Sequence, residues 1–82
     1  MITTTTEIYE ITERALGKCR NNGYEGVAQQ LDDAMHLGSS GLEILGAIKA
    51  VFLSHRETLE KVVGREQTQD VVAYVNKAYG IE

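Results

Sequence analysis

Residues 42 to 53 form an apolar segment that covers most of the circumference of a helix. Nine of these twelve residues are apolar, and the exceptions are Glu43, Gly46 and Lys49. A helix this apolar is normally buried on several sides. We therefore expect a central apolar helix at about 41–53 that is shielded from water on nearly every side, or that forms an oligomer interface with part of its surface.

Helical periodicity continues outside this segment. The chain has no proline, and its apolar residues recur at i, i+3 and i+4. This spacing predicts helices at about 6–21 and 25–37, and a last helix that begins at Gln67 or Thr68 and has Ala78 and Tyr79 on its inner face. Gly23, Gly38 and Gly64 are expected to end helices, because glycine readily takes the left-handed backbone conformation of a C-terminal cap.

Three pairs of residues have capping-box spacing, which is typical of helix N-termini: Thr4 and Glu7, Ser40 and Glu43, and Ser54 and Glu57. The third pair predicts a break near Ser54 and His55. An uninterrupted helix from 41 to 63 is the alternative, because Val51, His55, Leu59 and Val62 continue one helical face. The fold class is therefore all-α, a compact bundle of four short helices, or five if the chain breaks near Ser54.

The length of 82 residues allows one domain, 1–82. Eight basic residues oppose twelve acidic ones, for a net charge of −4. Nucleic acids and anionic membranes attract basic surfaces, so this balance argues against both as partners. It favours a protein partner with a basic surface. Solubility alone is the simpler explanation of the same charge.

We expect a cytoplasmic location. Residues 1–7 lack the basic and apolar regions of a signal peptide. Cys19 is the single cysteine, which rules out an internal disulfide. The longest apolar stretch is much shorter than the roughly 20 residues that span a bilayer.

Residues that could carry chemistry have simpler structural explanations. Cys19 lies on an apolar helical stripe, where a packing role is expected. Asp32 and His36 have i, i+4 spacing, but a structural metal site needs about four ligands. The turn at 38–41 precedes a helix and could hold an anion, yet an N-cap explains the same residues. We predict no catalytic residue, no cofactor and no metal.

Tyrosines are the better candidates for partner binding, because tyrosine is enriched in binding hot spots. Tyr9 and Tyr74 lie off the main apolar direction of their helices, and Tyr24 follows a predicted turn. The simpler role for all three is to cover the edge of the core with the hydroxyl in water. His55 is a fourth candidate because it lies at the predicted break.

These features predict a small acidic, non-catalytic helical protein. The leading hypothesis is a protein-interaction module, such as an inhibitor, an immunity-type protein or an adaptor. The alternative is a structural homo-oligomer, in the simplest case a homodimer, assembled through the apolar helix at 41–53. A carrier of a small ligand or an enzyme is a less favoured third reading, because a bundle this small has little volume for a cleft beside its own core.

Overall fold

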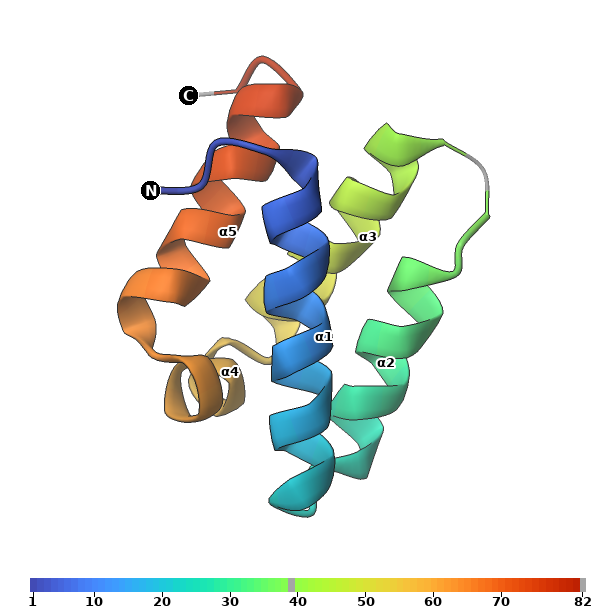
Figure 1. Ribbon diagram of the computed structural model, residues 1–82, viewed down its shortest axis with the longest axis vertical. Helices are drawn as coiled ribbons and strands as arrows, with labels where there is room; N and C mark the ends of the chain where they lie inside the picture. The colour runs from blue at the N-terminus through green and yellow to red at the C-terminus, as the bar shows by residue number, and fades with distance from the viewer. Residues whose placement is uncertain (39, 82) are drawn as a thin grey trace.

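A computed structural model describes residues 1–38 and 40–81 of the chain. Within these residues the chain forms five helices and no strand, which confirms the all-α prediction (Figure 1). The helices are α1 (Thr5–Asn21), α2 (Glu25–Met35), α3 (Gly41–Ser54), α4 (Arg56–Val63) and α5 (Arg65–Ala78). The radius of gyration is 11.5 Å, close to the roughly 12 Å expected for a compact domain of this length.

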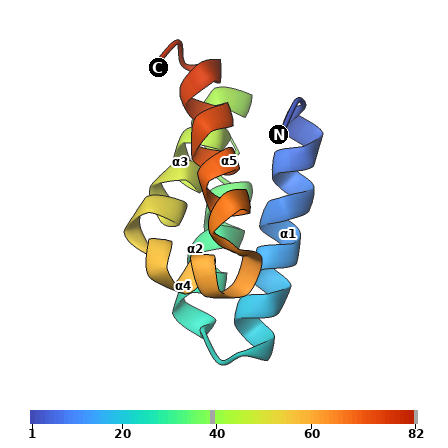
Figure 2. The same cartoon turned by 90° about the vertical axis from the view of Figure 1, so that its left-hand side faces the viewer.

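The helices pack around one apolar core. α1 and α2 form an antiparallel hairpin, and α3 lies on the far side of the molecule from α1 (Figures 1 and 2). α3 packs against α2, α4 and α5, while α4 also contacts α1. Every helix contributes to the core, whose fully buried large side chains include Ile8, Leu31, Ile48, Phe52, Leu59, Val71 and Val75.

At two of the three predicted capping boxes, the hydrogen bond to the N-cap hydroxyl is present. The Thr4 hydroxyl accepts a hydrogen bond from the Glu7 amide at 3.2 Å, and the Ser40 hydroxyl accepts one from the Glu43 amide at 3.2 Å. Each bond satisfies an amide that has no partner within its own helix. The starts of α1 and α3 are therefore encoded locally.

The third predicted capping box is wrong, although the break it indicated is present. Ser54 is the last residue of α3, and His55 alone separates α3 from α4. The His55 amide donates to the Val51 carbonyl at 2.9 Å, and the His55 carbonyl accepts from the Leu59 amide at 2.9 Å. One residue thus ends one helix and begins the next, so Ser54 is not in the N-cap position.

The predicted start of the last helix is also wrong, because α5 begins at Arg65. Gly64 occupies its N-cap position with a φ of +91°, a conformation that glycine adopts readily. Thr68 lies inside the helix and is fully buried, and its hydroxyl donates to the Gly64 carbonyl at 2.9 Å. Threonine often satisfies its hydroxyl in this way within helices, so the Thr68 hydroxyl does not cap α5.

The expectation that residues 42 to 53 are shielded on nearly every side is wrong for the single chain. Leu45, Ile48, Val51 and Phe52 are buried, but Leu42 and Leu53 are 52% and 44% exposed. The other helices pack against one side of α3 and leave the opposite side in water. Ala78 and Tyr79, predicted on the inner face of α5, are likewise exposed.

Candidate interaction surfaces

His55 joins three helices at one point. It lies between α3 and α4, half-buried, and its Nε2 atom is 3.1 Å from Oε1 of Gln30 on α2. This contact ties the α3–α4 junction to α2. Partner binding by His55 stays a prediction, and the contact gives the side chain a structural role in the isolated chain.

The three candidate tyrosines lie at the edge of the core. Tyr9, Tyr24 and Tyr74 are half-buried and pack against core residues. The Tyr74 hydroxyl lies 2.9 Å from Oγ1 of Thr5, which joins α5 to the first turn of α1. Tyr24 precedes α2 at the other end of α1, so it lies apart from Tyr74 and the three tyrosines do not form one site.

Tyr79, predicted on the inner face of the last helix, instead packs against Leu42 and Gly46 of α3. It is 46% exposed, and its hydroxyl donates to the Leu42 carbonyl. Its ring lies over Gly46, where a Cβ atom would overlap the tyrosine hydroxyl. A glycine within an otherwise apolar helix was the available signal, because such a glycine often marks a close approach.

A shallow groove of about 300 Å³ lies between α2 and α3. Leu37, just after α2, is 51% exposed at this groove. The residues that line it are mainly small or apolar: Gln30, Asp33, Ala34, Leu37, Ala47, Ala50 and Val51. Together with the exposed Leu42 and Leu53 on the outer side of α3, this groove forms what we call the α2–α3 face.

Carboxylates lie beside the α2–α3 face. Asp33 lines the groove from α2 and is exposed, and its Oδ1 atom accepts a hydrogen bond of 2.9 Å from Nε2 of Gln29. Glu43 is exposed on the first turn of α3, one helical turn before Ala47. The face therefore combines exposed apolar side chains with a negatively charged edge.

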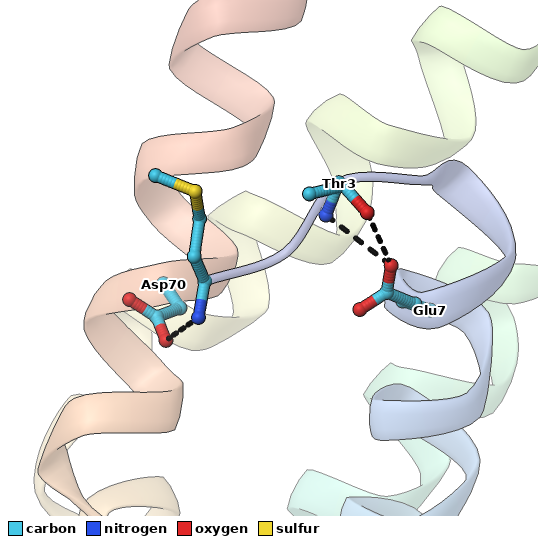
Figure 3. Close-up of polar contacts among 4 residues, drawn as sticks. Thr3, Glu7 and Asp70 are labelled. Carbon is cyan, nitrogen blue, oxygen red and sulfur yellow. Dashed lines mark hydrogen bonds and ion pairs between the residues drawn. The ribbon is translucent and has the colours of Figure 1, made fainter.

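Polar contacts hold the opposite side of the bundle together, where residues 1–3 pass between α1 and α5. The terminal ammonium of Met1 lies 3.6 Å from Oδ2 of Asp70 (Figure 3). The Thr3 amide and hydroxyl both donate to Oε1 of Glu7, at 3.3 and 2.8 Å. The hydrogen bonds from Thr3, above all, lower the pKa of the Glu7 carboxyl. We call this region the α1–α5 face.

Hollows flank residues 1–3 on both sides. One, of about 260 Å³, includes Glu7, Glu10 and Arg14 in its lining, and the other, of about 600 Å³, includes Glu66 and Lys77. Asp70 lines both. Charges of both signs therefore surround the segment, so the α1–α5 face has no single electrostatic preference.

The residues whose side chains could react or bind a metal lie apart from one another. Cys19 is fully buried, and burial raises the pKa of its thiol, which keeps it protonated near neutral pH. His36 pairs with Asp32 on the surface, with 3.3 Å between Nδ1 and Oδ1. Within the described ranges, 1–38 and 40–81, no group of three His, Cys, Asp or Glu residues gathers in a way that would hold a metal ion. Ser39, in the turn considered for anion binding, lies outside those ranges.

Two further findings concern membrane crossing and similarity to known proteins. In the part of the chain that the structure describes, none of the helices is both long enough and apolar enough to cross a bilayer. Comparison with protein-family models, with curated proteins and with solved structures finds no match to this chain.

Proposed function

We propose that the chain is a non-catalytic protein-interaction module that covers a basic surface of a protein partner, as an inhibitor, an immunity-type protein or an adaptor does. One observation carries the proposal: exposed leucines lie beside carboxylates on the α2–α3 face. Exposed apolar patches with polar edges are typical of surfaces that bind other proteins. The net charge of −4 supports a basic partner, because complementary charge speeds association and excludes wrong partners.

The proposal includes a cytoplasmic location. A single buried cysteine fits a compartment in which thiols stay reduced, since no internal disulfide is needed to hold the fold. The core provides the stability instead, with buried side chains from all five helices.

Capture from a native cytoplasmic extract tests the proposal. The tagged full chain should retain a protein at low salt, and the purified pair should bind with an affinity that falls as salt rises. Asp33→Asn combined with Glu43→Gln should weaken the complex, because both changes remove charge and keep shape. Recovery of no partner at low salt, or an affinity unaffected by salt and by these changes, would contradict the proposal.

A homodimer assembled through α3 is the second candidate. It is favoured by the exposure of Leu42 and Leu53, which lie on one side of the same helix. A two-fold interface sets the same patch against itself. Sedimentation velocity decides this case: a monomer at high micromolar concentration removes the candidate, and a dimer that Leu53→Glu dissociates supports it.

A further inference from the structure

The shallow groove between α2 and α3 is lined mainly by short or apolar side chains, a surface against which a third helix could pack. Its lining includes Ala34, Ala47 and Ala50, whose short side chains let another backbone approach closely. Leu37 stands at one end of the groove and is half exposed. Helices pack by placing the side-chain ridge of one into the groove of another. Two neighbouring helices with small residues between them offer such a groove.

The backbone of the bundle favours a helical occupant over an extended one. Extended peptides gain affinity by adding a strand to an exposed sheet edge. The amide and carbonyl groups of α2 and α3 bond within their own helices. A partner must therefore bind the groove through side chains, as an amphipathic helix does with apolar residues at i, i+3, i+4 and i+7.

The charge around the groove also indicates which kind of occupant it favours. Asp33 lines it with an exposed carboxylate, and Glu43 is exposed one helical turn before Ala47, whereas Lys49 lies on the other flank of the outer side of α3. A second copy of this chain would bring the same acidic edge against itself across a two-fold interface, which costs free energy. A basic occupant instead gains from both carboxylates.

We propose that the groove between α2 and α3 is the docking site for an amphipathic helix of the partner protein, with leucine-like residues toward Ala47 and Ala50 and lysine or arginine toward Asp33 and Glu43. This proposal rests on the proposed function and locates partner binding in the groove. The partner helix fills the apolar groove while its basic residues meet the two carboxylates.

A designed peptide tests the site with the full-length chain. The probe is a Leu/Lys amphipathic helix of about four turns, roughly 14 residues, and the matched control peptide has Glu in place of Lys. Amide shifts in NMR spectra should change along the groove, chiefly at Leu37, Ala47 and Ala50. Fluorescence anisotropy should show that the Leu/Lys peptide binds more tightly than the Leu/Glu peptide.

Two matched variants separate the groove from general attraction to an acidic protein. Ala50→Arg places a long cation in the groove, and Ala73→Arg makes the same change at an exposed alanine of α5 on the α1–α5 face. We expect A50R to weaken binding of the Leu/Lys peptide at least about tenfold and A73R to leave it nearly unchanged. Both positions are exposed, so both variants should keep the wild-type melting temperature.

Several outcomes would overturn the assignment of the groove. These are failure of the Leu/Lys peptide to bind, shifts confined to the α1–α5 face, equal losses from A50R and A73R, or equal binding of the two peptides. Groove shifts that grow with protein concentration alone would identify a second copy as the occupant. A partner captured equally well by wild type and A50R would leave the proposed function standing and remove the groove from it.

Discussion

The α1–α5 face and the α2–α3 face differ in what completes them. On the α1–α5 face, the chain supplies its own polar partners: Tyr74 meets Thr5, Asp70 meets the terminal ammonium, and Glu7 meets Thr3. On the α2–α3 face, exposed leucines line the surface. Polar groups are satisfied by single nearby partners or by water, but an apolar side chain needs a whole surface to cover it. Five short helices do not supply that surface for every side of α3.

The energies involved point the same way. Fully burying a leucine contributes about 1.5 to 3 kcal/mol, so Leu42 and Leu53, each about half exposed, retain an unused part of that. The exposed ion pair of Met1 and Asp70 contributes between 0 and about 1 kcal/mol. Covering the leucines of the α2–α3 face with a partner would therefore contribute more free energy than the ion pair contributes to the α1–α5 face.

The largest expected effect contrasts two adjacent residues of α3. Phe52→Ala should lower the free energy of unfolding by about 3 to 5 kcal/mol, because Phe52 is fully buried. Leu53→Ala, its exposed neighbour, should change it by less than about 1 kcal/mol. Urea unfolding followed by circular dichroism measures both. Similar losses from the two variants would mean that α3 has no inner and outer side.

An intermediate effect is expected where the α1–α5 face is closed. Tyr74→Phe removes the hydroxyl that contacts Thr5 and should cost about 1 kcal/mol of stability. Thr5→Ala should remove the same contact, so the double variant should lose less than the sum of the single losses. Additive losses in urea unfolding would show that the two hydroxyls do not interact.

Gly46 offers a smaller effect that depends on Tyr79. Gly46→Ala gains about 1 kcal/mol of helix propensity, but the new Cβ displaces the Tyr79 hydroxyl from the Leu42 carbonyl. These effects should nearly cancel in the wild type. In a Tyr79→Ala background the same change should stabilise the protein by about 1 kcal/mol. Thermal unfolding of the four proteins in this cycle measures these effects. The same effect of Gly46→Ala in both backgrounds would contradict the close packing.

The smallest effect is the pH dependence of the α1–α5 face. The pKa of Glu7 is lower in the folded protein, so its contribution is present above the unfolded value of about 4.3 and is lost as pH falls through the folded value. Glu7→Gln should therefore lower the melting temperature slightly at pH 7. The gap between the variant and the wild type should shrink well below pH 4. A gap that stays constant with pH would exclude a contribution from the carboxylate charge.

Most of the helices followed from the sequence because their signals are local. The bonds of Thr4 and Ser40 to nearby amides depend on residues three positions away. The same property led to a correct prediction at Thr4 and a wrong one at Thr68. Both have a hydroxyl able to cap a helix, but Thr68 is buried inside α5 and bonds to Gly64 instead. Burial depends on neighbouring helices, so residue type alone did not distinguish the two.

The α2–α3 face was only partly predictable. The apolar segment at 42–53 predicted a helix that is shielded on nearly every side or that forms an oligomer interface, and in the single chain its outer side is exposed. The groove also depends on where Leu37 and Ala34 of the α2 region lie relative to Ala47 and Ala50, which is a matter of packing. Tyr79 borders this face through its contact with Leu42, a residue 37 positions away.

By itself, the sequence determined the helical class, the ends of most helices and the strongly apolar character of one of them, because periodicity, glycine turns and caps act over a few residues. Only the tertiary structure decided which side of that helix stays in water, that His55 meets Gln30, and that Asp33 lines the apolar groove. These outcomes depend on how distant helices pack, and packing selects one arrangement from several that the local pattern allows.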